Sequence, residues 1–502
     1  KKGGLNMISL LGNGAIVNDE KWFNDMLEDL NIRQIFQGIK SVSSGYNVED
    51  MYKMFPVNRE MMEFRREITK DIGNESIRKL FDEFSRGMKR VRSLEDNGKY
   101  SKNEVQQIKF HCSALNTYFE TLNQLRMGLE QVDRLCFALQ SVLESVQAYM
   151  DKDSIRESKT LAKEVYTYFC ENGFLVSVGK DIVKIEKCSL TRDKDETLTN
   201  HSLGGIKVDN LGDVLQLLPI EKVLVQYFEQ NEKKLFKTMT QLRKVKIEED
   251  FLTLENELQF YLSFYRYIVQ FQQMGYDFCM PELGDSIEIE DGYDFALAGK
   301  KMSNSNKVVA NSFRLCGQER IVVVTGANGG GKTTYARMVG EILFFSMLGL
   351  LAPAKSVTLP YFDSIRTHFS VEESEKIGRG KLLEELQRLK LLFEGEKEKQ
   401  FVILNELFTT AATKDALEMG KHTMDLMIKM DMWGIYVTHI QGLAEETEHI
   451  VSMVAELAKD HKTRLYRILR RLPEEEEYED SLIEKHHLLE EQIKEVLSNG
   501  LQ

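Results

Sequence analysis

The sequence predicts an α/β domain with a mostly parallel sheet, joined to a long all-α region that carries a small β insertion. Residues 291–475 alternate apolar, β-branched runs with helical runs, a pattern typical of parallel sheets. Residues 61–290 instead place apolar side chains at intervals of three, four or seven, which indicates long helices. Only six prolines occur in the whole chain, which also favours long helices.

The length and charge of the chain limit its organisation and its partners. Its 502 residues exceed what one ordinary hydrophobic core holds, so we expect two or three domains. The expected divisions are an N-terminal segment (1–60), the helical region (61–290), the α/β domain (291–475) and a helical tail (476–502). The net charge of −13 argues against a uniformly basic surface for nucleic acid, although local basic faces remain compatible with it.

Cysteine usage and hydropathy indicate a cytoplasmic protein without membrane contact. The six cysteines form no CxxC pair, so they indicate neither a disulfide framework nor a zinc site. No apolar run reaches the roughly 18 residues that span a bilayer. The opening KKGGLNMISLL is too short for a signal peptide with its cleavage site.

Within the helical region, one segment differs from its surroundings. Residues 174–190 are rich in β-branched side chains, with a Gly-Lys-Asp turn between two short runs. This predicts a β-hairpin inserted between long helices. The pattern leaves open whether the helices form extended arms or a compact bundle.

Three predicted strands and one predicted helix indicate the α/β domain. RIVVVTG (320–326), QFVILNE (400–406) and WGIYVTH (433–439) predict buried strands. TTYARMVGEILFFSML (333–348) predicts a helix directly after the first of these strands. Parallel strands with helical crossovers are therefore expected.

The segment between this first strand and its helix has the Walker A pattern GxxxxGK[ST]. Glycines let successive N–H groups point at phosphate oxygens, and the following helix adds its partial positive charge. The pattern predicts an ABC-type P-loop that binds ATP, with the Lys332 amine at the β- and γ-phosphates and the Thr333 hydroxyl on Mg²⁺. The predicted ATP-binding residues are Gly326, Ala327, Asn328, Gly329, Gly330, Gly331, Lys332, Thr333 and Thr334.

Two further strand ends carry candidate catalytic residues. Asn405 and Glu406 follow the apolar run of residues 401–404. We expect Asn405 to bind Mg²⁺ through a water and Glu406 to act on the attacking water. His439 ends the third strand, where it can sense the γ-phosphate; together with Glu406 and Lys332 it completes the predicted catalytic set.

These segments together resemble the ATPase domain of the MutS family of DNA mismatch-repair proteins. The resemblance rests on VVTGANGGGKTTYARMVGEILFFSMLGLLAPA (323–354), VILNELFTTAATKDA (402–416), YVTHIQGLAE (436–445) and VVANSFRL (308–315). Asn405-Glu406 in place of Asp-Glu is similar to a short bacterial MutS-like branch. The long helices and hairpin of residues 60–290 resemble, more loosely, the lever and clamp of the family.

The resemblance implies an ATPase dimer with composite sites, in which ATP binding closes the sites and alters a channel for DNA. The family's Ser-rich segment, which reaches the partner's ATP, corresponds to Gly378, Arg379, Gly380 and Lys381, with Gly380 where a Ser is expected. Residues 1–60 show no counterpart of the mismatch-reading Phe-x-Glu wedge, so mismatch specificity is not expected. The family also implies duplex or branched DNA as partner, and a nuclease or other repair protein as a possible further partner.

The residues themselves support DNA binding less directly. Residues 77–103 hold eight Lys or Arg against four Asp or Glu, and KKLFKTMTQLRKVK (233–246) is a second basic cluster. Such faces can neutralise phosphates without reading sequence, but they can also be plain solvated surface. Two alternatives therefore stay open: an ATP-switched module that binds a protein instead of DNA, and a slowly hydrolysing switch with a Mg²⁺ site weakened by Asn405.

Overall fold

The computed structural model describes residues 9–12, 21–56, 58–101, 104–178, 183–189, 225, 227–302, 307–369, 381–393, 399–458 and 463–473. The chain forms two compact units. One combines Lys1–Leu10 with Asp71–Leu258, and the other combines Leu11–Lys70 with Gln259–Gln502. The chain passes from one unit to the other within α4 (Arg59–Gly73) and α11 (Glu249–Gln273).

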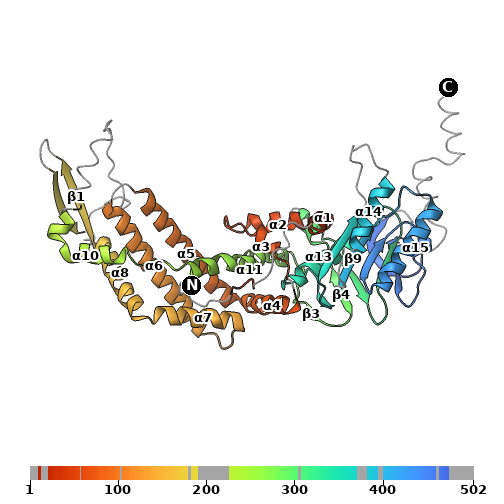
Figure 1. Ribbon diagram of the computed structural model, residues 1–502, viewed down its shortest axis with the longest axis horizontal. Helices are drawn as coiled ribbons and strands as arrows, with labels where there is room; N and C mark the ends of the chain where they lie inside the picture. Colours follow the sequence, from red (N-terminus) through yellow and green to blue (C-terminus); the bar gives the residue numbers. More distant parts are fainter. Residues whose placement is uncertain are drawn as a thin grey trace, which may run out of the picture. The chain divides into compact units, whose positions relative to one another are not determined.

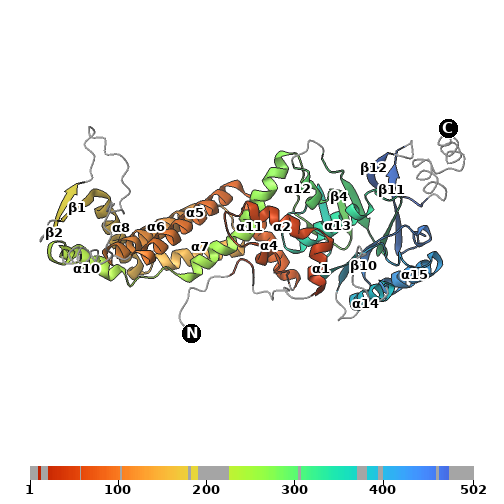
Figure 2. The same ribbon diagram turned by 90° about the horizontal axis from the view of Figure 1, so that it is seen from above.

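The first unit is built from helices that lie side by side (Figures 1 and 2). Its helices are α5 (Glu75–Tyr100), α6 (Glu104–Glu130), α7 (Phe137–Met150), α8 (Asp153–Glu171) and α10 (Lys233–Leu242). Helices α5 and α6 approach closely at two glycines. A Cβ added at Gly87 would collide with Thr121, and one added at Gly128 would collide with Leu80. The small residues thus bring the two helix backbones together.

A hairpin follows α8 in this unit. Strands β1 (Asn172–Val178) and β2 (Val183–Ser189) pair antiparallel, with Asn172 opposite Ser189. They lie where the sequence predicts a hairpin; the Gly-Lys-Asp turn itself falls outside the described residues.

The core of the second unit is a six-stranded sheet in the order β12-β11-β6-β10-β9-β8. The strands are β6 (Ile321–Thr325), β8 (Ser364–Phe369), β9 (Gln400–Asn405), β10 (Trp433–Val437), β11 (Ile450–Leu457) and β12 (Arg464–Arg470). All neighbours pair parallel except β12, which is antiparallel to β11 at the edge. The mostly parallel sheet predicted for this part of the chain is therefore present.

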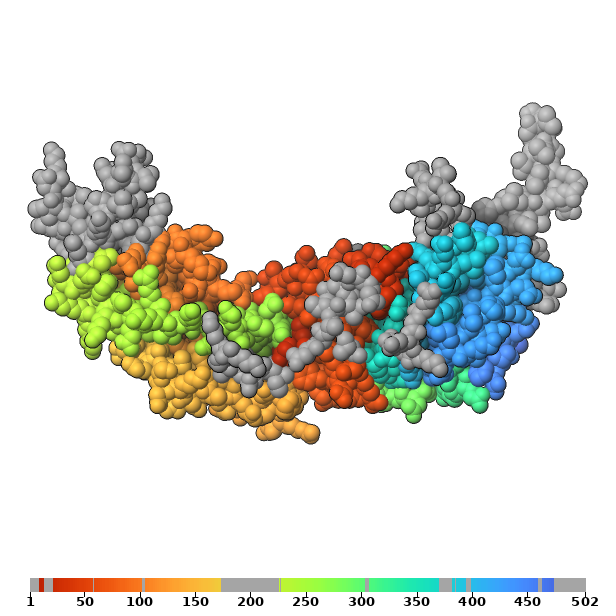
Figure 3. Space-filling model, viewed as in Figure 1, coloured from red at the N-terminus to blue at the C-terminus, as the bar shows by residue number. Residues whose placement is uncertain are grey.

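Helices cover both faces of this sheet, as the alternation of strand side chains requires. Val402, Leu404 and Tyr436 share an apolar cluster with residues of α14 (Lys381–Phe393) and α15 (Thr413–Lys429). The surfaces of these two helices adjoin in the space-filling view (Figure 3). On the other face Ile403 packs near Gly340 of α13 (Lys332–Met347), the helix that follows the loop.

A smaller sheet and the N-terminal helices complete this unit. The smaller sheet has the order β3-β7-β4-β5, formed by β3 (Glu282–Leu283), β7 (Ser356–Leu359), β4 (Ile287–Gly292) and β5 (Asn311–Leu315), with α12 (Phe295–Lys300) after β4. The N-terminal helices are α1 (Lys21–Asp29), α2 (Ile32–Ser41) and α3 (Glu49–Tyr52).

The N-terminal segment groups with the large sheet and does not stand apart as residues 1–60 were expected to do. Asp29 of α1 accepts a hydrogen bond of 2.7 Å from the Thr367 hydroxyl of β8, and Leu30 lies against Gly340. Burial of apolar side chains from α1 and α2 explains this grouping. In the described ranges no helix is long and apolar enough to cross a bilayer. The expected tail at 476–502 lies outside them.

Candidate functional site

The glycine-rich loop connects the C-terminal end of β6 to the first turn of α13. Gly326, Gly329 and Gly331 have φ values of 121°, 71° and 96°, which L residues with side chains rarely adopt. A Cβ at Gly326 would also lie 2.9 Å from the Cβ of Ala455 in β11. The backbone conformation therefore favours glycine at all three positions, and at Gly326 the neighbouring strand also excludes a side chain.

Lys332 turns back over the loop that precedes it. Its Nζ donates to the Gly326 carbonyl oxygen at 2.7 Å, and to the Ala327 carbonyl and the Asn328 Oδ1, both at 3.3 Å. The residue is 4% exposed. Burial lowers the pKa of Lys332, and the negative charge of Glu406 opposes this effect. The amine is thus held at the loop, facing groups that can be exchanged for phosphate oxygens.

Thr333 and Asn405 meet across two different elements. The Thr333 Oγ1 donates to the Asn405 Oδ1 at 3.0 Å. Thr333 lies in the first turn of α13 and Asn405 is the last residue of β9, which β10 separates from β6. Asn405 is 8% exposed, so its amide oxygen is directed at the hydroxyl and away from solvent. A hydroxyl and an amide oxygen side by side are hard ligands of the kind that Mg²⁺ or its bound waters accept.

Glu406 follows directly in an unusual backbone conformation. Its φ is 53° and that of Phe408 is 61°, both in the left-handed region, which costs on the order of 1–3 kcal/mol each for such residues. The Glu406 N–H donates to the Val437 carbonyl at 2.9 Å. The Phe408 N–H donates to a carboxylate oxygen of Glu385 in α14 at 3.2 Å. These bonds hold the strained turn, and with it the Glu406 side chain, at the end of the sheet.

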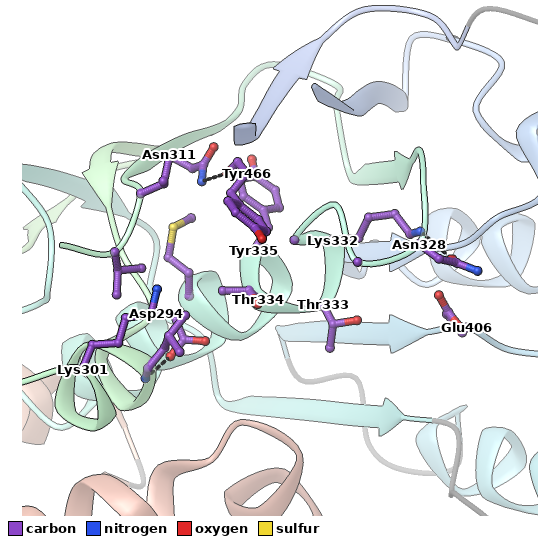
Figure 4. A pocket seen from close by; sticks show the side chains of 16 residues that line it. Asp294, Lys301, Asn311, Asn328, Lys332, Thr333, Thr334, Tyr335, Glu406 and Tyr466 are labelled. Carbon is purple, nitrogen blue, oxygen red and sulfur yellow. Dashed lines mark hydrogen bonds between the residues drawn. The ribbon is translucent and has the colours of Figure 1, made fainter. Parts of the chain in front are cut away.

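A pocket of about 350 Å³ lies over the loop. Its wall includes the side chains of Lys332, Thr333 and Glu406 from the predicted site. Figure 4 shows Glu406 on the side of the pocket nearest Thr333 and Asn328, with Tyr466 beyond the loop. The motif residues therefore converge on one cavity.

The far wall of the pocket includes two residues that sequence reasoning missed, Asn311 of β5 and Tyr466 of β12. The Asn311 Nδ2 donates to the Tyr466 carbonyl at 3.0 Å, and the Asn311 Oδ1 accepts from the Ile468 N–H at 2.8 Å. Tyr466 itself has a φ of 58°. The likeness of segment 308–315 to the family is a signal for Asn311. No motif indicated Tyr466.

The remaining predicted residues are less closely tied to this cavity. His439 follows the end of β10 and is exposed, and it is not among the residues that line the pocket. Gly378, Arg379 and Gly380 lie outside the described residues. Lys381 begins α14, and its side chain is also outside them.

Fold and site together define the class: an α/β domain with a glycine-rich loop between a central strand and its helix, and polar residues at the end of a strand two positions away. Residues 322–483 match the sequence model of the family described as MutS domain V. The chain is MutS-like in this part, which contains the loop and every strand of the large sheet from β8 to β12.

Individual proteins give the same result over a similar length. The chain is 30% identical over 141 residues to the DNA mismatch repair protein MutS of Thermotoga sp. strain RQ2, covering 28% of this chain and 18% of that protein. It is 24% identical over 159 residues to the DNA mismatch repair protein MSH3 of Scheffersomyces stipitis, covering 31% of this chain and 15% of that protein. The matched part thus spans less than a fifth of either relative.

Proposed function

We propose that the chain binds ATP with Mg²⁺ at the loop and hydrolyses it. The observation that carries this proposal is the convergence of Lys332, Thr333 and Glu406 on one pocket, with Asn405 hydrogen-bonded to Thr333 beside it. The similarity to MutS domain V supports the same proposal. The relatives' names also suggest a role in mismatch repair, although mismatch specificity itself is not part of the proposal.

The residues present fit both ATP and Mg²⁺. Gly330 has to be a glycine, since a Cβ there would lie 2.9 Å from the Ala327 carbonyl oxygen. A glycine-rich loop before a helix can direct its N–H groups at phosphate oxygens. Lys332 supplies positive charge for the β- and γ-phosphates. The Thr333 hydroxyl would hold the metal directly and the Asn405 amide through a water. Bound Mg²⁺ supplies neutralisation of charge on the phosphates.

Glu406 is the group that would act on the attacking water. Its carboxylate lines the pocket beside Thr333, and its backbone is fixed to β10. A carboxylate held in this way can orient a water and accept its proton. His439, at the end of β10, is proposed as a sensor of the γ-phosphate. Its side chain is exposed, so it is free to meet groups that a second subunit adds to the site.

Nucleotide titration tests the first part of the proposal. Lys332→Ala should reduce the affinity for a fluorescent ATP analogue by at least about a hundred-fold, because the charge that meets the phosphates is lost. Lys429→Ala in α15 is the matched control, since Lys429 is exposed and outside the pocket. Equal affinity in both variants would mean that the loop is not the nucleotide site.

We further propose a homodimer with composite ATP sites that binds duplex or branched DNA in an ATP-dependent manner. The basic helix α10 supports the DNA part best. Its Lys233, Lys234 and Lys237 are exposed, and no ion pair joins them to other described residues. In α5 several cations already have acidic partners; Arg92, for example, lies 2.5 Å from the buried carboxylate of Glu255. Within the cluster at 233–246 Arg243 is paired with Glu104 at 2.8 Å, so the three lysines of α10 are the better candidates for phosphate contact.

Gel shifts over a range of salt concentrations, with and without ATP, test this second part. Lys233→Gln, Lys234→Gln and Lys237→Gln combined should weaken binding to duplexes and junctions and reduce the salt slope, because each lost phosphate contact lowers that slope by about 1. The same charge change in α15, at Lys414, Lys421 and Lys429, is the control. If wild type binds no DNA at low salt while ATP turnover is intact, the DNA role is rejected. Light scattering reports the oligomeric state.

A further inference from the structure

An arginine outside the loop motif lies against the phosphate-binding loop. Arg464 is the first residue of β12, and its Nε is 3.3 Å from the position that a Cβ would occupy on Gly329. Gly329 has a φ of 71° and no side chain, so the guanidinium can approach the loop backbone. A side chain at this position of the loop would occupy the space that Arg464 uses.

The Nε of Arg464 is buried, and no described residue accepts a hydrogen bond from it. Buried N–H groups nearly always have an acceptor, so a group without one points to an acceptor that comes from elsewhere. The positive charge of Arg464 also acts on Lys332, whose pKa it lowers together with burial, while Glu406 opposes both. Two cations at one loop, one of them with an unused buried donor, are best satisfied by an anionic ligand.

The start of β12 is held in place from the other side of the pocket. Asn311 binds both the Tyr466 carbonyl and the Ile468 N–H, and so ties β12 to β5. Tyr466, two residues after Arg464, lies beside the loop in Figure 4. Arg464 is thus presented by a strand whose position is fixed, which lowers the entropic cost of a contact with a ligand.

We propose that Arg464 contacts the phosphates of the nucleotide bound to its own loop, as a second cation beside Lys332. The inference rests on the proposed function, because it takes the ligand to be a nucleotide. A guanidinium suits this role since its planar fork matches phosphate oxygens and always carries a charge. Because the contact is made to phosphates, it strengthens binding of a nucleoside triphosphate more than binding of a monophosphate.

The test compares two nucleotides on three proteins by fluorescence competition. The nucleotides are the β,γ-imido analogue of ATP, which is not hydrolysed, and AMP. R464Q should lower affinity for the imido analogue by about ten-fold and leave AMP affinity unchanged, because one charge-assisted contact is lost. R467Q is the matched control: Arg467 lies on the same strand but is exposed, unlike the buried Nε of Arg464 against Gly329, and its variant should behave as wild type.

Two results would overturn the inference while leaving the proposed function intact. The first is an R464Q protein that binds the imido analogue as tightly as wild type. The second is an equal loss of affinity for the analogue and for AMP, which would indicate a distorted pocket. A wild type that binds neither nucleotide instead rejects the proposed function itself. If circular dichroism shows that R464Q is unfolded, R464K replaces it. A smaller loss, still confined to the imido analogue, is then expected, since lysine keeps the charge but lacks the fork; no loss, or an equal loss for AMP, would overturn the inference.

Discussion

The Thr333 hydroxyl donates a hydrogen bond of 3.0 Å to the Asn405 amide oxygen, and this bond joins the loop helix to the end of β9. The position that carries Asn405 is the acidic position of most P-loop ATPases, and here it holds a neutral side chain. An amide oxygen can bind a metal-bound water but brings no charge. The strength of the proposed Mg²⁺ site therefore depends on a neutral pair.

Asn405→Asp should lower the Mg²⁺ concentration for half-maximal ATP turnover by about ten-fold. An added unit charge about 4 Å from a cation contributes at least about 1 kcal/mol, and a carboxylate still accepts the Thr333 bond. Turnover measured over a range of Mg²⁺ concentrations reports the change. Asn405→Ala, which removes the acceptor, should raise the required concentration. An increase with Asp would indicate that Asn405 is not near the metal.

Glu406→Gln should leave nucleotide affinity within about two-fold of wild type and reduce phosphate release by about 10²–10⁴-fold, because an amide cannot accept the proton of the attacking water. Gln is preferred to Gly because Gly would relieve the left-handed backbone strain at this position, whereas Gln keeps the strain as it is in wild type. Phosphate release and ATP-analogue binding are measured on the same preparation. Glu385→Gln is a useful comparison, since it keeps an acceptor for the Phe408 N–H. Unchanged turnover in Glu406→Gln would assign the catalytic role elsewhere.

The parts of the fold that depend on local sequence could be predicted. The strand, loop and helix from Ile321 to Met347 follow one another within a few residues, and the order of the motifs was sufficient to expect Asn405 near Thr333. The opposite edge of the sheet was not predicted. The residues of β12 (RLYRILR) are mostly exposed and basic, and they form a strand because they pair with β11. Neither β11 nor β12 was expected from its own residues.

The pocket shows the same division between local and long-range information. Asn311 and Tyr466 are 155 residues apart, and the bond between them depends on how two sheets meet. Sequence motifs relate residues a few positions apart, so they cannot predict a contact across 155 residues. Similarly, the grouping of α1 with β8 depends on a pairing of Asp29 with Thr367 across 338 residues. Residues 1–60 could therefore not be assigned to the α/β unit from their pattern alone.

Gly340→Ala should destabilise the α/β unit by about 1–2 kcal/mol, although alanine normally favours a helix interior over glycine by about 1 kcal/mol. The added Cβ would lie 2.6 Å from a methyl carbon of Leu30 and 2.8 Å from one of Ile403. Both neighbours are fully buried and cannot move away freely. Urea unfolding gives the free energy. Leu30→Ala opens space at the same point, so in that background Gly340→Ala should lower the free energy of unfolding by less. An equal loss in both backgrounds would exclude this contact as the cause.

Asp29 makes the stability of the α/β unit depend on pH. Burial raises the pKa of Asp29 to about 6, although the Thr367 hydroxyl favours the charged form. In the unfolded chain the carboxyl titrates near its ordinary value of about 4. Between these two values the folded state binds more protons, so the contribution of Asp29 is most favourable below pH 4 and is lost as the pH rises through 6. His368 lies in β8 next to Thr367, and burial lowers its pKa to about 4, so its effect on stability runs in the opposite direction.

Asp29→Asn should therefore remove one pH-dependent contribution and leave the other. The quantity to follow is the difference between the free energies of unfolding of wild type and Asp29→Asn. His368 is present in both proteins, so its effect cancels. The difference should fall as the pH rises from 4 to 6 and then level off. The amide can still accept the Thr367 bond, so the comparison isolates the charge. Urea unfolding at half-unit pH steps measures both proteins. A difference that stays constant over this range would show that Asp29 titrates alike in the folded and unfolded chains.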